Sequence, residues 1–236
     1  MTALPKTEPR AAPPPGSSRL DPALSEFDLA PGPTPAVVDV RFRALVGEEG
    51  WDRLPEAVQR RFSRRLSPGV VQVYVGEVLE TRRTWAGRVL SFLARAIGAP
   101  LPLDDDMRGG ATVAVMENAA LGGQSWTRTY ARAGHFPQVI HSAKCFAGPT
   151  GLEEHVGGGV GMALSVAEEG GALVFRSVRY FVAVGRLKVP IPRLLAPGEM
   201  EIVHKDEGGG SFLFTLALRH PLLGVIVQQT ARFRDV

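Results

Sequence analysis

The chain has 236 residues, of which 44% are hydrophobic, a formal net charge of +3 and an isoelectric point near 9.3. This charge is too small for a dedicated nucleic-acid-binding protein, so no nucleic-acid partner is expected. The one cysteine, Cys145, excludes an internal disulfide. A signal peptide and an apolar run long enough to span a membrane are both absent from the sequence, which predicts a cytoplasmic protein.

Residues 1–36 differ in composition from the rest of the chain. They hold nine of the 19 prolines, including the run Pro13–Pro15. Such a segment buries too little apolar surface to offset the entropy of ordering it. We therefore expect a disordered Pro-rich arm over 1–36, acting as a tether rather than docking on an aromatic groove. Residues 37–236 are expected to form a single domain.

Two short helices are predicted after the arm. The first carries Val40, Phe42 and Leu45 and ends near Gly47. The second begins at Asp52, a residue type that caps helices, and has an apolar face made of Leu54, Val58 and Phe62. An alternating pattern from about 70 to 83 then predicts a strand, with a bulge at Gly76.

The stretch 85–98 predicts the main helix. Its polar residues form one thin stripe, made of Arg88, Ser91 and Arg95, and apolar residues cover most of the remaining circumference. A helix with so wide an apolar arc has to pack against a large apolar surface of the protein. We expect it to be buried on its Phe92 side.

The remainder of the chain reads as strands joined by short glycine-rich turns, over 111–119, 123–131, 137–147, 151–156, 160–169, 172–184, 198–207, 211–219 and 223–234. The prolines of 189–197 predict a corner between two of them. Short connections join antiparallel neighbours. The predicted fold class is α+β: a large curved antiparallel sheet, half-barrel or barrel-like, packed on one main helix, with short N-terminal helices.

Several segments resemble the bacterial domain-of-unknown-function family 4166. They are Phe42–Leu45 with Leu54-Pro55, Trp126–Tyr130, Ile191–Pro197 and His220–Gly224, and the resemblance covers roughly 40–234. Relatives often follow a nucleotide-binding dehydrogenase-like domain, so the resemblance implies a redox-enzyme partner. This chain has the Pro-rich arm in that place. The family supplies no functional residues that could be carried over.

The sequence matches no common motif for a metal site, a cofactor site or a catalytic nucleophile. The five histidines lack zinc-ligand spacing, and the glycine run 157–161 matches neither a dinucleotide nor a Walker loop. We therefore predict no metal, no cofactor and no catalytic residue.

One candidate site rests on an assumed strand register. Trp126, Arg128 and Tyr130 share one face of a strand, either an ordinary solvent face or a cavity wall where Arg128 anchors a carboxylate or phosphate. If the next hairpins place His141 opposite Trp126 and Glu154 opposite Cys145, all five residues converge as a ligand-binding set: Trp126, Arg128, Tyr130, His141 and Glu154. A slip of one residue would scatter them between faces.

These patterns leave three functions open. The leading interpretation is a non-catalytic binding module for a small apolar, amphipathic or acidic ligand, since large antiparallel cups commonly hold one. The first alternative is a small-molecule enzyme, or an accessory domain to an oxidoreductase, with His141 or Glu154 as acid or base. The second is a structural or protein-interaction domain with a filled core.

Overall fold

The structure is a computed structural model that describes residues 37–105, 108–185 and 187–235, all within the unit Ala36–Val236. The predicted arm, 1–36, lies outside the described residues.

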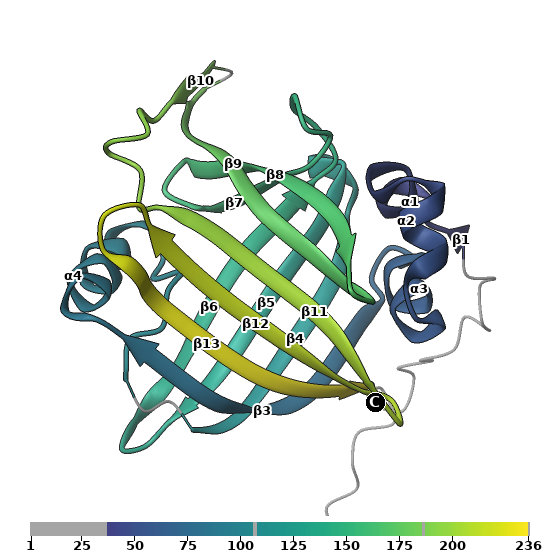
Figure 1. Ribbon diagram of the computed structural model, residues 1–236, viewed down its shortest axis with the longest axis horizontal. Coiled ribbons are helices and arrows are strands. Elements are labelled where there is room, and N and C mark those ends of the chain that lie inside the picture. The colour runs from purple at the N-terminus through teal and green to yellow at the C-terminus, as the bar shows by residue number, and fades with distance from the viewer. Residues whose placement is uncertain (1–36, 106–107, 186, 236) are drawn as a thin grey trace, which may run out of the picture. The chain divides into compact units, whose positions relative to one another are not determined.

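Within the described residues, ten strands form a closed antiparallel barrel (Figure 1). Around the barrel the order is β9-β11-β12-β13-β3-β4-β5-β6-β7-β8, and the pairing of β8 with β9 closes it. The strands are β3 (Val71–Arg83), β4 (Gly109–Asn118), β5 (Gly123–Arg132), β6 (His135–Cys145), β7 (Glu153–Gly157), β8 (Val160–Glu169), β9 (Ala172–Val184), β11 (Glu199–Gly208), β12 (Ser211–His220) and β13 (Gly224–Asp235). The barrel-like antiparallel sheet predicted from the sequence is confirmed, in a fold that is mostly β.

Three small strands lie outside the ring. The short β10 (Leu187–Pro190) forms a hairpin with β9 beyond the barrel edge, and β1 (Val37–Val38) pairs with β2 (Arg64–Arg65). The loop 191–197 then leads into β11, where the prolines predicted a corner.

Helices lie at the two opposite ends of the barrel (Figure 1). One end carries α1 (Arg41–Val46), α2 (Glu48–Arg53) and α3 (Glu56–Phe62). The sequence predicted two helices here and a cap at Asp52. Asp52 instead lies inside α2, and Pro55 precedes α3. The rings of Phe42 and Phe62 are 5.1 Å apart and both are buried, so these helices close their end of the barrel.

The other end carries α4 (Trp85–Leu93), which continues as the 3-10 helix η2 (Ala94–Ile97). The predicted helix is present, but the expectation that its Phe92 side is buried is wrong. Phe92 is 66% exposed, whereas the small residues Gly87, Ser91 and Ala94 face the barrel. A Cβ on Gly87 would lie 2.0 Å from the carbonyl oxygen of Ile226. The helix therefore packs on the barrel through its smallest residues, so closely that backbone meets backbone, and its largest side chains point to solvent.

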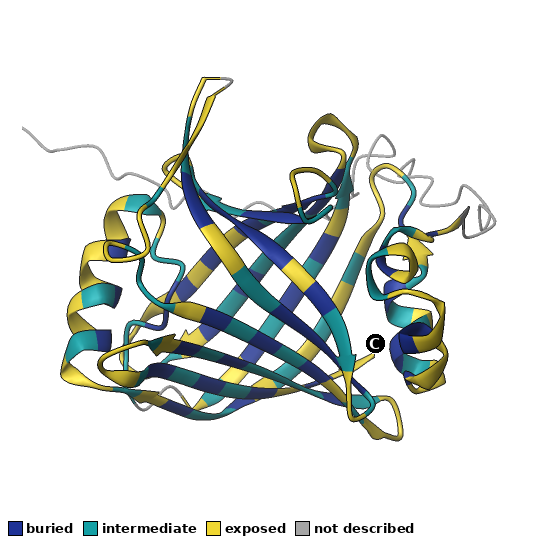
Figure 2. Cartoon of the chain, turned by 45° about the horizontal axis from the view of Figure 1, so that its top comes forward, coloured by how far each residue is buried: buried dark blue, intermediate teal, exposed yellow. Residues whose placement is uncertain are grey.

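Buried and more exposed residues alternate along the strands (Figure 2), as expected when successive side chains point to opposite faces of a sheet. On β3 the interior positions include Gln72 and Tyr74, which line a cavity, while Val73 on the outer face is 37% exposed. The bulge predicted at Gly76 occurs at Leu79, the residue that the pairing with β13 skips. Gly76 instead permits close approach, because a Cβ there would lie 1.9 Å from the carbonyl oxygen of Arg232.

Candidate functional site

A layer of charged side chains crosses the barrel interior. Arg128 comes from β5, Lys144 from β6 and Glu154 from β7, three neighbouring strands. The Lys144 ammonium lies 3.0 Å from Glu154 Oε2, and Arg128 Nη2 lies 3.7 Å from Glu154 Oε1. Arg128 also donates a hydrogen bond of 3.0 Å to the Ser142 hydroxyl. All three charged side chains are at most 7% exposed.

The layer holds two cations and one carboxylate. Burial lowers the pKa of Lys144, and Arg128 lowers it further, although Glu154 opposes both. Burial alone would raise the pKa of Glu154, but the charges of Lys144 and Arg128, together with hydrogen bonds from Ser142 and Lys144, lower that pKa. Glu154 is therefore held ionised. Its one negative charge is shared by two buried basic groups, which is an unfavourable arrangement in an apolar surrounding.

An apolar cavity of about 300 Å³ lies between this layer and the α4 end of the barrel. Its walls are apolar apart from Arg128, Glu154 and Tyr180. Burial raises the pKa of Tyr180 to about 12, so its phenol stays protonated. The cavity thus combines a hydrocarbon-like interior with a few polar groups at defined places, as ligand sites do.

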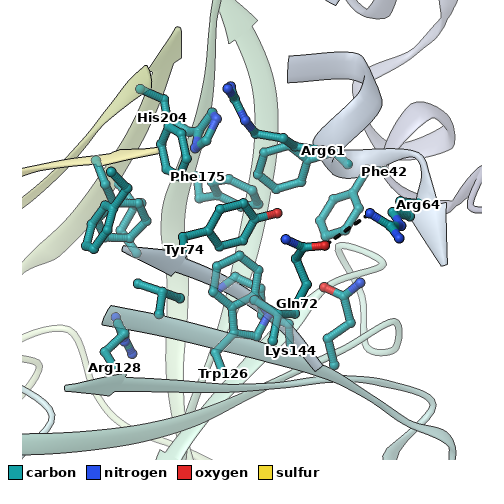
Figure 3. A pocket seen from close by; sticks show the side chains of 18 of the residues that line it. Phe42, Arg61, Arg64, Gln72, Tyr74, Trp126, Arg128, Lys144, Phe175 and His204 are labelled. Atoms are coloured by element: carbon teal, nitrogen blue, oxygen red, sulfur yellow. Dashed lines mark hydrogen bonds between the residues drawn. The ribbon is translucent and has the colours of Figure 1, made fainter. Parts of the chain in front are cut away.

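A smaller cavity of about 50 Å³ lies on the other side of the layer, toward α1–α3 (Figure 3). Arg128 lines both cavities, so the charged layer separates them. Eight of the 19 residues that line the smaller one are Phe, Tyr or Trp, and the Lys144 ammonium lies 4.8 Å from the centre of the Trp126 ring. Such a contact stabilises a cation. Two residues that line this smaller cavity are joined by a hydrogen bond of 3.1 Å, which Arg64 donates to Gln72 (Figure 3).

Some buried donors near the layer lack a partner. Among the described residues, neither Arg128 Nε nor Trp126 Nε1 has a hydrogen-bond acceptor. Buried polar groups are nearly always paired, by protein, water or ligand. An unpaired guanidinium nitrogen beside an apolar cavity is therefore a place where a ligand acceptor could bind.

The interior brings together four of the five residues in the sequence-predicted set. Trp126, Arg128, Tyr130 and Glu154 all point inward, and Tyr130 is buried in an apolar cluster of the barrel core. The placement of His141 was wrong. It pairs with Thr127, not Trp126, and so lies on the outer face, where its Nδ1 is 3.1 Å from the Thr127 hydroxyl.

Two register errors explain this outcome. The β5–β6 hairpin was assumed to close at Ala131 and Phe136, and its first pair, Arg132 with His135, keeps that register. Phe136 and Pro137 of β6 then lie opposite the single residue Ala131, and this bulge shifts every later pair by one, so Trp126 faces Ser142. The next connection is also one residue off, since Cys145 faces Glu153 and Lys144 faces Glu154. The two shifts cancel for Glu154, which returns to the predicted face. They do not cancel for His141.

Sequence reasoning missed Lys144, Ser142 and His204. Polar residues at alternate positions of β6, among them Gln138, Ser142 and Lys144, look like an ordinary solvent face. All three are buried inside the barrel instead. His204 lines the smaller cavity, and burial lowers its pKa to about 3. The sequence carries no signal that would have identified them without the register.

The lone cysteine is structural in position. Cys145 is free and buried, and burial raises the pKa of its thiol. As for membrane crossing, α4 and the other helices in the described part of the chain fall short of the length and apolarity that a span needs.

Comparison with known proteins identifies the family. The profile for the domain of unknown function DUF4166 matches residues 54–233, which is most of the chain and includes all of the barrel except the last two residues of β13. Neither the curated proteins nor the solved structures contain a match. The barrel with its charged layer thus belongs to a member of the DUF4166 family.

Proposed function

We propose that the barrel binds one small amphipathic molecule, with its apolar part in the cavity next to α4 and a negatively charged head at Arg128. The observation that carries this proposal is the environment of the Arg128 side chain. Its guanidinium is buried at the end of an apolar cavity, its Nε lacks an acceptor among the described residues, and it shares Glu154 with Lys144.

The charge balance favours a monoanion. Arg128 shares its one carboxylate with Lys144 and its Nε has no acceptor among the described residues, so a single negative charge would complete its pairing. A carboxylate also matches the donor geometry of a guanidinium, which binds it through two parallel hydrogen bonds. A fatty acid or another carboxylate amphiphile is therefore the ligand class that this interior fits best.

The cavity itself supports binding over a filled core. At about 300 Å³ it falls at the lower end of the range for small-molecule sites. An acid–base enzyme receives less support from the geometry. His141 lies on the outer face, away from the interior, and Glu154 is held ionised by two cations, which makes it a poor proton donor.

Calorimetric titration with decanoate and decanol tests the proposal, because the two ligands share a chain and differ in the head. The wild-type chain should bind decanoate at least about tenfold more tightly, the contribution expected of a hydrogen bond to a charged group. Arg128→Met should bind the two ligands alike. Arg234→Met removes an exposed arginine from the end of β13 and should keep the wild-type preference.

Two results would contradict the proposal. One is equal affinity of the wild type for decanoate and decanol. The other is an undiminished preference for decanoate in Arg128→Met, once circular dichroism has shown that the variant folds.

A further inference from the structure

Exposed apolar side chains gather at the α4 end of the barrel. We call this set the apolar rim; its members come from α4, the 191–197 loop and the β12–β13 turn, and each is between 62% and 86% exposed: Trp85, Phe92, Leu93, Leu194, Leu195 and Leu222. Large exposed apolar patches on a soluble fold mark interaction sites.

The three segments of the rim are neighbours in space. The amide of Thr84, at the start of α4, donates to the Ile226 carbonyl at 3.0 Å, which places the helix beside the start of β13. Leu93 of α4 and Leu195 of the loop line the same cavity. Both are also mostly exposed, so the apolar wall of the cavity continues onto the outer surface at the rim.

A positively charged cleft of about 660 Å³ adjoins the rim. It is lined by Arg179, Arg193 and Arg219, with Glu199 as its one carboxylate. All three arginines are exposed, and none has an ion-pair partner within the residues that the structure describes. Tyr180 lines both the cleft and the apolar cavity, so the two are separated by a single layer of side chains.

We propose that this end of the barrel docks on the surface of an anionic lipid bilayer. Apolar side chains of the rim enter the headgroup region, as interfacial helices do, and the three arginines contact lipid phosphates. Charge complementarity supports the assignment, because unpaired guanidinium groups lie beside the apolar side chains. Leu93 and Leu195 belong to both the cavity wall and the rim, and this continuity favours a bilayer over a protein, since a bilayer could supply apolar molecules to the cavity.

Docking does not require the anion-binding role of Arg128, so the two proposals fail separately. The test is co-sedimentation of the full chain with vesicles of phosphatidylcholine alone and of phosphatidylcholine mixed with phosphatidylglycerol. The chain should bind the mixed vesicles more tightly, and added salt should weaken that binding. Arg128→Met should bind vesicles as the wild type does.

Two double variants probe the surface. Arg193→Gln with Arg219→Gln should weaken binding to mixed vesicles roughly thirtyfold, as expected from losing two cations near an anionic surface. Phe92→Ser with Leu194→Ser should weaken binding to both kinds of vesicle by about tenfold or more. Because these side chains are exposed, the variants should fold normally.

Matched controls lie at the opposite end of the barrel. Arg60→Gln with Arg234→Gln makes the same change in charge, and Leu121→Ser removes an exposed leucine. Both should bind mixed vesicles nearly as the wild type does. Binding that is equal for both vesicle types, or lowered equally by the controls and the rim variants, would overturn the proposal. So would rim variants that change only self-association in ultracentrifugation, which would assign the surface to a protein interface.

Discussion

Arg128 and Glu154 face each other in the barrel interior, their charged groups 3.7 Å apart, and both line the apolar cavity next to α4. Lys144 reaches the same carboxylate from the strand between them. The cavity therefore ends at a layer in which two basic side chains share one carboxylate. This relationship makes the interior suited to an amphipathic anion, and it also has consequences for stability.

The first prediction concerns the balance of the charged layer. Glu154→Gln leaves two buried cations without a counterion and should lower the free energy of unfolding by about 3–5 kcal/mol, as loss of one partner from a buried pair does. Arg128→Met leaves the balanced pair of Lys144 and Glu154 and should be far less destabilising. Urea unfolding of the ligand-free chain measures both. Equal destabilisation by the two variants would show that charge balance does not govern this layer.

The second prediction concerns the exposed face of α4. Because Phe92 is 66% exposed, Phe92→Ala should change the free energy of unfolding by no more than about 0.5 kcal/mol, as exposed substitutions do. Phe233→Ala is the matched variant, since Phe233 is 1% exposed, and should be destabilising by about 3–5 kcal/mol. A large loss of stability in Phe92→Ala, seen in urea unfolding, would place that ring in the core.

The third prediction concerns the packing of α4 on β13. In Gly87→Ala the new methyl group would lie 2.0 Å from the Ile226 carbonyl oxygen, so the helix has to move. The expected loss is about 1–3 kcal/mol, as for other overpacked sites. Gly110→Ala is the control, because a Cβ at Gly110 meets nothing within 4 Å. If thermal unfolding midpoints fell equally in both variants, close packing at Gly87 would not be the cause.

The fourth prediction is a pH dependence of stability caused by His204. Burial lowers the pKa of this imidazole from 6.5 to about 3, and the nearby charge of Arg61 acts in the same direction. In the unfolded chain the group takes up its proton near pH 6.5, so stability is lost as the pH falls from there toward 3. Between pH 7 and pH 5 the loss should be about 2 kcal/mol.

His204→Leu removes this contribution. Between pH 7 and pH 5 the free energy of unfolding of this variant should fall by about 2 kcal/mol less than that of the wild type. Parallel curves for the two proteins in urea unfolding would show that His204 is not protonated on unfolding.

Much of the fold could be predicted because strand patterns and turn glycines are local signals. The β9, β12 and β13 strands lie close to the ranges expected from the sequence. The buried side of α4 could not be predicted from hydrophobicity, because the helix packs through Gly87 and Ser91 at backbone distance. Close packing of small residues leaves the large ones outside, which reverses the usual relation between apolarity and burial.

The candidate site depended on register, which is not a local property. A single bulge at Phe136–Pro137 of β6 moved His141 to the outer face and brought Lys144 inside. Arg128 lies on the predicted face because the register was counted from its own strand, β5. Glu154 lies on the predicted face because the shifts at the two hairpins cancel. The charged layer could therefore be seen only once the pairing of β5, β6 and β7 was known.

The most direct test of the central claim is an NMR pH titration of decanoate bound to the full chain, with its carboxyl carbon isotopically labelled. If the head lies beside Arg128, the pKa of the bound carboxyl should be lowered well below that of the free acid. In Arg128→Met the same carboxyl should titrate at higher pH than in the wild type. A bound carboxyl that titrates like the free acid in both proteins would contradict the account.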